Sequence, residues 1–226
     1  MAELKRQTLG DATGKVGHVV FRIKGNKNLI CKDSVRTAIP TAEVLARRAK
    51  FALTSQICKG IYESGILKNM WPKPGTNKGT RFSEMFKKNY AINGTPDHIG
   101  KAAVIPAHGV EVKNALVTLT LEGMTITADQ FEASAQIDPN VEKMIMAEGI
   151  VIMTTPTVAG DPEYKVLSIK TGQQSLESDQ PISLSFAFGG GTLGEYKSYT
   201  DKKVFLTFLT LKTTGEAVNY TEQFNN

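Results

Sequence analysis

Glycines flank a lysine near the start of the chain, an arrangement that cradles phosphate in nucleotide-binding proteins. Residues 10–16 read GDATGKV. A Walker loop has four residues between its glycines, then Lys followed by Ser or Thr for the magnesium ion, and it begins after a buried strand. Here three residues separate Gly10 from Gly14, Val16 takes the Ser/Thr position, and the preceding residues are polar. The segment therefore predicts backbone turns rather than a nucleotide site.

A second glycine-rich stretch, GGGTLG at residues 189–194, matches the G-x-G-x-x-G pattern of dinucleotide-binding proteins. That pattern binds pyrophosphate where a strand leads into the glycines and a helix N-terminus follows them. A strand-like run precedes these glycines, but the residues after them, EYKSYTDKKVFLTF, resemble a turn and another strand. The stretch therefore predicts a flexible β–β loop and no cofactor site.

Histidine and cysteine spacings favour neither a metal site nor a catalytic site. No pair among His18, His98, His108, Cys31 and Cys58 has the spacing of zinc ligands. No serine lies in a G-x-S-x-G nucleophile elbow. We therefore expect no catalytic residue, no cofactor and no metal. A hydrolase whose residues meet only in the folded chain stays an open alternative.

Length and composition predict a folded, soluble protein. The chain has 226 residues and is 41% hydrophobic, which is enough to bury a core. Its first residues, MAELKRQTLGDATG, lack the apolar segment of a signal peptide. No later apolar run approaches the roughly 20 residues of a membrane span. We expect a protein made in the cytoplasm, with both cysteines reduced and packed.

Charge is divided unevenly along the chain. Residues 1–101 carry 19 Lys and Arg against 7 Asp and Glu, a net charge of +12. Residues 102–226 carry 8 against 15, a net charge of −7. A basic segment joined to an acidic one suits a phosphate-rich partner, and equally suits copies of one chain that meet basic end to acidic face. Charge alone leaves both alternatives open.

Residues 18–32, HVVFRIKGNKNLICK, predict a β-hairpin. Gly and Asn at residues 25–28 tolerate the positive φ angles of a tight turn. Because side chains alternate along a strand, the apolar residues Val19, Phe21 and Ile23 share one face. A lone two-stranded hairpin is marginal in water. We therefore expect this apolar face to be an assembly interface that docks on a partner surface.

The middle of the chain predicts two helices. The first begins at Thr41 as N-cap, with Glu43 in its first turn, and apolar residues then recur at helical spacing. RFSEMFKKNYA, residues 81–91, predicts a second short helix, and the Pro, Gly and Asn residues of 71–80 predict a loop. The expected buried face of the first helix consists of Leu45, Ala49, Leu53, Ile57 and Ile61.

From about residue 109 the hydrophobic periodicity changes to two. Short β-branched runs separated by Gly, Pro, Asp or Asn predict an antiparallel β-sandwich. PNVEKMIMAEG, residues 139–149, fits either a helix or another strand. The other predicted strands lie within residues 112–123, 124–137, 149–158, 164–171, 181–188 and 202–213.

The predicted fold class is α+β, mainly β: an N-terminal hairpin arm and helices followed by an antiparallel, immunoglobulin-like β-sandwich. Three domains are expected. Residues 1–40 form an extended arm with the hairpin, residues 41–101 a basic helical segment, and residues 102–226 the β-sandwich domain.

Cations of the first part of the chain form a candidate partner-binding set. Phosphate contacts need such side chains, and Trp71, in the loop beside two of them, could stack on a base. No helix-turn-helix, zinc or RNA-recognition signature organises the set, so a solvated or protein-facing basic surface is the alternative. Its members are Lys15, Arg22, Lys24, Arg47, Arg48, Lys50, Lys73 and Arg81.

Three motifs carry a family resemblance. Gly14, Lys15, Gly17, Val19, Val20 and Gly25 fill a G-K-x-G hairpin pattern, residues 46–51 follow A-x-R-x-K-F, and a late strand ends in TTGEAVNY. Together they resemble a family of proteins from Bacteroidota and their phages whose function is not established. The resemblance covers the two ends better than the middle, and because its motifs are structural it implies no catalytic residue.

The small size, basic arm, helical middle and β-rich end are also similar to auxiliary or connector proteins of tailed-phage virions. The resulting prediction is a non-enzymatic structural protein of a bacteriophage virion, an auxiliary capsid or head-tail component made in the host bacterial cytoplasm. Its expected partners are other virion proteins and copies of itself, without a membrane or a small-molecule substrate. The alternative is a nucleic-acid-binding protein that uses the basic segment 15–81.

Overall fold

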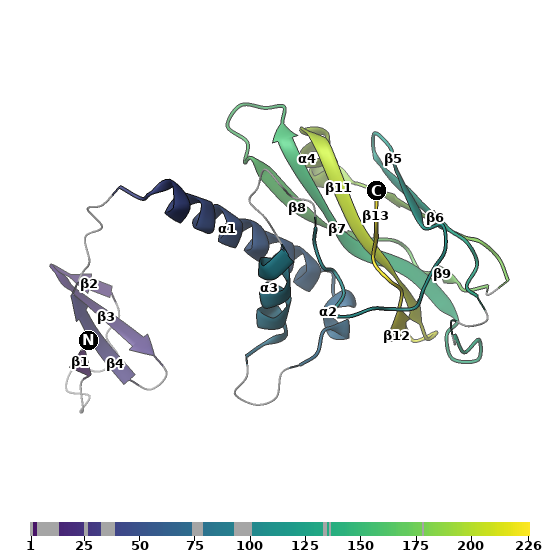
Figure 1. Ribbon diagram of the computed structural model, residues 1–226, viewed down its shortest axis with the longest axis horizontal. Coiled ribbons are helices and arrows are strands. Elements are labelled where there is room, and N and C mark those ends of the chain that lie inside the picture. Colours follow the sequence, from purple (N-terminus) through teal and green to yellow (C-terminus); the bar gives the residue numbers. More distant parts are fainter. Residues whose placement is uncertain are drawn as a thin grey trace. The chain divides into compact units, whose positions relative to one another are not determined.

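The computed structural model describes residues 2–3, 14–24, 27–32, 39–73, 79–92, 101–132, 135, 137–177 and 179–226. For residues 2, 3, 23, 24, 27 and 28 it describes the backbone alone. The chain forms two compact units, which we call unit 1 (Met1–Thr41) and unit 2 (Ala42–Asn226) (Figure 1).

Unit 1 is an antiparallel sheet of four short strands. The predicted hairpin is confirmed, because Phe21 pairs with Ile30 across its two strands and Lys24 pairs with Lys27. The hairpin does not stand alone, as the sequence argument for a partner surface had supposed, since a further strand pairs with each outer edge. Gly25 and Asn26, the first two residues of the predicted turn, lie outside the described residues. The strand order is β1 (Ala2–Glu3), β4 (Lys27–Lys32), β3 (Val19–Lys24) and β2 (Gly14–Val16).

Unit 2 contains two antiparallel sheets that pack face to face. One hydrophobic cluster joins residues of both sheets, among them Ile126 and Leu184 of the smaller and Val151 and Leu206 of the larger. The smaller sheet has the order β10 (Ile182–Ala187), β6 (Gly123–Ala128), β5 (Leu116–Leu119). The larger has the order β12 (Ala217–Tyr220), β11 (Tyr199–Leu211), β7 (Met144–Pro156), β8 (Tyr164–Lys170), with β13 (Phe224–Asn225) on β11 and β9 (Gln174–Ser175) on β7.

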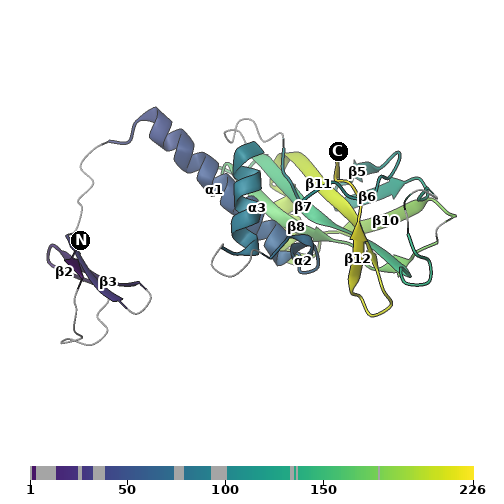
Figure 2. The ribbon, with the colours of Figure 1, turned by 60° about the horizontal axis from the view of Figure 1, so that its bottom comes forward.

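Helices cover the other face of the larger sheet. A second cluster joins Leu53, Ile57 and Ile61 of the first helix to Ile150 and Phe205 of the sheet. Figures 1 and 2 show these helices on one side of β7, β8 and β11, and β5 and β6 on the other. These helices are α1 (Ala42–Glu63), α2 (Leu67–Met70) and α3 (Arg81–Ile92). A fourth helix, α4 (Gly190–Lys197), follows β10 in the chain, and its Tyr196 belongs to the cluster between the two sheets.

The sheets and helices confirm the α+β, mainly β prediction. An immunoglobulin-like arrangement stays a prediction, because these strand orders do not establish it. Residues 139–149, which fitted two alternatives, lead into β7 and form its first half. Because β7 lies between two cores, its side chains are buried on both faces, and MIMAEGIVIM lacks the alternation of a half-exposed strand.

Only the second half of α1 is seated on the sheet. Gly60 allows the close approach, since a Cβ there would lie 3.1 Å from Ile150 Cγ2 and 3.1 Å from Val166 Cγ1. Ser168 Oγ donates a hydrogen bond to the Gly60 carbonyl at 2.7 Å. The first half projects beyond the sheet (Figures 1 and 2). Leu45, predicted on the buried face, is therefore 51% exposed, and that part of the prediction is wrong.

The loop predicted at residues 189–194 is wrong, because α4 begins at Gly190. Its glycines are poor helix formers, but Tyr196 fixes the element by stacking on Phe188, with ring centroids 4.3 Å apart, and by donating to the Thr120 carbonyl. The strand before it belongs to the smaller sheet, and the strand after it pairs antiparallel in the larger one. The reason given against a dinucleotide site, that no helix follows the glycines, is therefore wrong. The antiparallel strands on either side of α4 do not form the parallel βαβ unit that such a site uses, and the absence of a cofactor stays a prediction.

The close approach at Gly60 gives a stability test. Replacing Gly60 with Val forces methyl groups against Ile150 and Val166, so we expect the free energy of unfolding to fall by about 1–3 kcal/mol. Gly194→Val in α4 is the matched control, because no neighbouring atom lies within 4 Å of a Cβ there. Urea unfolding should show no loss for the control; equal losses in both variants would contradict the close approach.

Candidate partner-binding surfaces

The apolar face of unit 1 lies largely open. Val16 and Val19 are directly paired across β2 and β3, and their exposed fractions are 71% and 36%. Phe21 and Ile30, paired across β3 and β4, continue this face and are half-buried. Ile23 also belongs to β3, but its side chain lies outside the described part. We call Val16, Val19, Phe21 and Ile30 the unit 1 face.

Unit 1 lacks a core among the residues whose burial is described. None of these residues is buried: each is half-buried or exposed. A single-layer sheet needs a second layer over its apolar side to be stable, because side chains on an uncovered face stay in water. The unit 1 face therefore has the properties of a docking surface.

The cations predicted on the hairpin lie on the opposite face. Lys15 pairs with Val20 across β2 and β3, and Arg22 follows two residues later on that side. Arg22 is exposed, whereas the Lys24 side chain lies outside the described part. Half-buried Val20, Leu29 and Cys31 share that face with the cations, because Val20 pairs with Cys31 and Arg22 with Leu29. Lys32, opposite Val19, lies at the edge of the unit 1 face.

A second surface forms where the projecting half of α1 crosses α3. Three rings form a ladder there: Phe51 lies 4.9 Å from Phe86, and Phe86 stacks on Tyr90 at 5.6 Å, centroid to centroid. Phe51 is 58% exposed. Beside it is an open hollow of about 520 Å³. We call it the α1–α3 hollow, and its lining is Val44, Arg47, Arg48, Phe51 and Tyr90.

Helical spacing brings three predicted cations to this hollow. Arg47 donates to Glu43 at 3.0 Å within α1. Arg48 is exposed on the hollow's rim. Lys50 Nζ lies 4.6 Å from the centroid of the Tyr90 ring, an attractive cation–π contact. Cations beside the exposed Phe51 ring suit a partner that carries both carboxylates and apolar groups.

The other predicted cations do not join this group. Lys73 is exposed in the segment after α2. Arg81 donates to the Asn69 side chain at 2.9 Å and lies in the first turn of α3, about 14 Å along the helix axis from Tyr90. The predicted base-stacking role of Trp71 is wrong, because its ring is 2% exposed and its Nε1 donates to the Val104 carbonyl.

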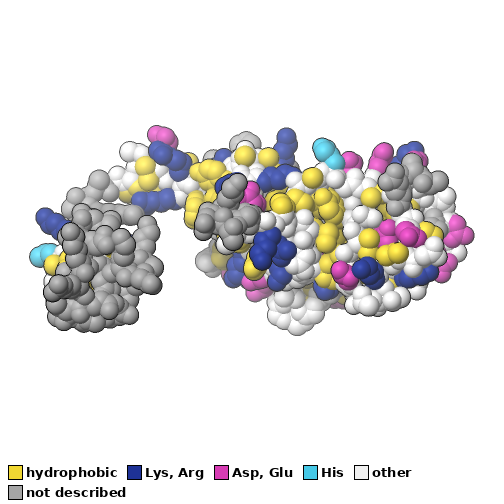
Figure 3. All heavy atoms as spheres, turned by 90° about the horizontal axis from the view of Figure 1, so that it is seen from below, with side chains coloured by type: hydrophobic (Ala, Val, Ile, Leu, Met, Phe, Trp, Pro, Cys, Tyr) yellow, Lys and Arg dark blue, Asp and Glu magenta, His cyan; other side chains and the backbone are white. Residues whose placement is uncertain are grey.

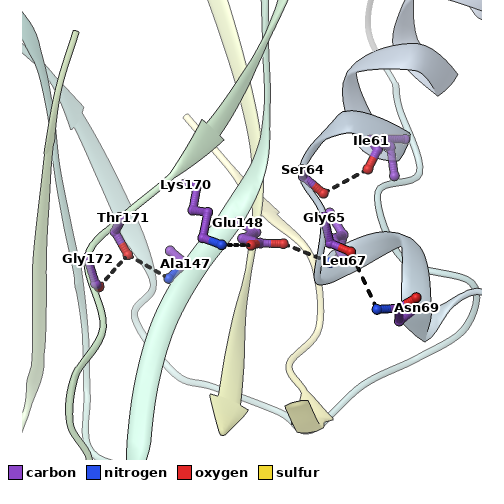
Figure 4. Close-up of polar contacts among 10 residues, drawn as sticks. All are labelled: Ile61, Ser64, Gly65, Leu67, Asn69, Ala147, Glu148, Lys170, Thr171 and Gly172. Atoms are coloured by element: carbon purple, nitrogen blue, oxygen red, sulfur yellow. Dashed lines mark hydrogen bonds and ion pairs between the residues drawn. The ribbon is translucent and has the colours of Figure 1, made fainter. Parts of the chain in front are cut away.

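Glu148 holds the helices against the sheet. Its carboxylate is fully buried and accepts a hydrogen bond from the Leu67 backbone N–H at 2.7 Å, at the start of α2. Lys170, its cross-strand neighbour on β8, lies 3.5 Å away on the other side (Figure 4). Burial raises the pKa of Glu148 above its usual 4.5, and the Leu67 amide and the Lys170 ammonium partly oppose that rise. This contact fixes where α1 ends and α2 begins.

Other ionisable groups are used in structural contacts. Burial raises the pKa of the Cys58 thiol to about 12, which suppresses the reactive thiolate. Lys88 donates to the carbonyls of Ile105 and Pro106, and burial lowers its pKa. In the described ranges no three His, Cys, Asp or Glu side chains are grouped as metal ligands. Nor is any helix there long and apolar enough to cross a membrane.

Sequence reasoning missed the aromatic members of the hollow and the Glu148 anchor. Phe51 lies within the A-x-R-x-K-F pattern, but it falls between the apolar positions chosen for the buried face. Tyr90 lies in the second predicted helix and was not among the predicted binding residues. A lone Glu inside the apolar run MIMAEGIVIM was the available signal for a buried, partnered carboxylate.

No protein-family model matches the chain, and the search of curated proteins found no match either. The resemblance to proteins of Bacteroidota and their phages stays a prediction.

The Glu148 anchor predicts a graded loss of stability. Glu148→Ala leaves the buried Leu67 N–H without an acceptor, so we expect the free energy of unfolding to fall by about 1–3 kcal/mol. Glu148→Gln retains an acceptor oxygen and should lose less. Urea unfolding at neutral pH measures both. An unchanged free energy of unfolding in Glu148→Ala would contradict the anchoring role of Glu148.

The same anchor predicts a pH dependence. Because the folded-state pKa of Glu148 lies above its unfolded value, the stability linked to its protonated form is complete below about pH 4.5 and is lost as pH rises through the folded pKa. The unfolding free energy of the wild type, relative to Glu148→Gln, should therefore fall as pH rises from about 4 towards 7. A rise over this range would contradict the raised pKa.

Proposed function

We propose that the protein is a non-enzymatic structural protein that assembles with other subunits through unit 1. The single observation that carries this proposal is the open unit 1 face on a sheet without a described buried residue. A unit of this kind gains its missing layer when a partner surface covers it. Fully burying one side chain of Val or Phe size contributes roughly 1.5–3 kcal/mol, so covering this face is a substantial gain.

We further propose that the assembly is a bacteriophage virion, in which the chain is an auxiliary capsid or head-tail component. Support comes from the sequence motifs around Gly14 and Ala46 and from the chain's organisation, with a small N-terminal β unit attached to a larger α+β unit. The partners would then be other virion proteins or further copies of the chain.

Incorporation into particles tests this proposal. Cells that carry the gene and release particles would express the wild type, Val16→Asp/Val19→Asp or Arg22→Asp, and the chain would be quantified in purified particles by mass spectrometry. We expect the double variant to be incorporated roughly tenfold less or worse, because it places two charges on the unit 1 face.

Arg22→Asp is the matched control, since it changes the formal charge by the same amount but on the opposite face of the sheet. It should be incorporated like the wild type. Absence of the wild-type chain from particles would contradict the virion assignment. Equal incorporation of Val16→Asp/Val19→Asp would contradict docking through the unit 1 face.

Nucleic-acid binding through residues 15–81 is the second candidate, favoured by Arg48 and Lys50 beside the exposed Phe51 ring. It predicts that binding to duplex DNA weakens steeply with salt, with log K falling by about 0.9 per log unit of salt for each phosphate neutralised. Replacing Arg47, Arg48 and Lys50 with Gln should flatten the slope by about 2.7, measured by fluorescence anisotropy. An unchanged slope would remove these residues from this candidate.

A further inference from the structure

Positive and negative charges are unevenly distributed along unit 2, although its net formal charge is zero. Its helical part, residues 42–101, carries 11 Lys and Arg against 4 Asp and Glu, a net charge of +7. Residues 102–226 carry a net charge of −7. In the space-filling view most acidic side chains lie over the β-rich end (Figure 3). One chain therefore offers both halves of a complementary pair.

Three of the eleven cations of the helical part gather at the α1–α3 hollow. Among the described residues Arg47, Arg48 and Lys50 outnumber the carboxylate in contact with them, Glu43, which leaves a local charge of +2. The exposed Phe51 ring adds an apolar contact surface at the same place. A partner of opposite charge with an exposed apolar side chain would satisfy both properties.

An acidic patch beside β5 and β6 has these properties. Glu132 lies 2.5 Å from Lys113 Nζ and, together with Glu111 and Asp129, raises the Lys113 pKa. Three carboxylates against one ammonium leave a local charge of −2. Exposed Leu116 lies on β5 opposite Thr127, two residues before Asp129. A hollow of about 360 Å³ is lined by Lys113, Asp129, Gln130, Glu132 and Pro181.

The two surfaces cannot meet within one copy. The α1–α3 hollow is on the helical side of the larger sheet, whereas β5 and β6 lie on the other side (Figures 1 and 2). A contact between them must therefore join different copies. Each copy would keep one surface open for the next, which produces a closed ring or an open row of subunits.

We propose that the α1–α3 hollow of one copy binds the acidic patch of a second copy, with Arg47 and Arg48 pairing with Asp129 and Glu132. Guanidinium groups form bidentate hydrogen bonds with carboxylates, so arginines suit this contact better than lysines. Leu116 packs against the Phe51 ring. Unit 2 alone makes this contact, which stands separately from the docking of unit 1.

Charge reversal and rescue test this contact in the full chain. All variants carry Val16→Asp/Val19→Asp, so that association through the unit 1 face is suppressed, and circular dichroism confirms folding. By sedimentation equilibrium at low salt, from micromolar to near-millimolar concentrations, this background chain should self-associate. Arg47→Glu/Arg48→Glu and Asp129→Lys/Glu132→Lys should each weaken association by roughly tenfold or more.

Mixing the two reversed variants should restore association, because each retains the surface that the other lacks. Lys59→Glu/Lys203→Glu changes the formal charge by the same amount as Arg47→Glu/Arg48→Glu, at exposed positions outside both surfaces, and should associate like the background chain. A background chain that stays monomeric throughout would overturn the proposal. A mixture of the two reversed variants that fails to associate would also overturn it. So would an Arg47→Glu/Arg48→Glu variant that still self-associates like the background chain and loses only its binding to a DNA duplex.

Discussion

The seating of the second half of α1 on the larger sheet determines which surfaces unit 2 exposes. Gly60 lets the helix approach Ile150 and Val166, and the Glu148 carboxylate accepts the Leu67 amide just beyond the helix end. A 22-residue helix is about 33 Å long, so a helix fixed at this end extends past the sheet edge at the other. The exposed Phe51 ring and the cations around it are consequences of this placement.

The two proposed surfaces differ in chemistry. The unit 1 face is largely apolar, and no residue of unit 1 whose burial is described lies buried beneath it, so its docking would be driven by removal of apolar area from water. The contact proposed for unit 2 is charged and partly exposed, so it would favour correct orientation and would weaken with salt. Two weak contacts on one chain reinforce each other once both can form, because the second becomes intramolecular. That combination suits a subunit of a large assembly.

The sequence predicted elements with strong local patterns and missed features decided by distant neighbours. The strands of the hairpin and the first helix follow from periodicity, and α1 begins directly after Thr41 as expected. Leu45 fitted the buried face by spacing, but spacing does not reveal where the supporting sheet ends. Trp71 was expected in the open because of its loop, yet the Val104 carbonyl accepts its N–H in the core. The glycines of α4 argued against a helix, which Tyr196 stabilises by stacking on Phe188 outside the helix.

The candidate surfaces were recovered unevenly for the same reason. Alternation along β3 placed Val19 and Phe21 on one face, and β2 then added Val16 to it. Sequence could also group Arg47, Arg48 and Lys50, because they are neighbours on one helix. It could not bring Phe51 to Phe86 and Tyr90, which belong to different helices. Contacts between elements depend on tertiary packing, which local sequence patterns do not reveal.

Hydrogen–deuterium exchange of the dilute, full-length chain tests the central claim most directly, namely that unit 1 completes its fold on a partner. If unit 1 lacks a core, the amides of β3 and β4 exchange rapidly, while those of β7 and β11, buried on both faces, stay protected. On assembly the β3 and β4 amides should become protected. Protection of β3 and β4 in the dilute chain equal to that of β7 and β11 would contradict the claim.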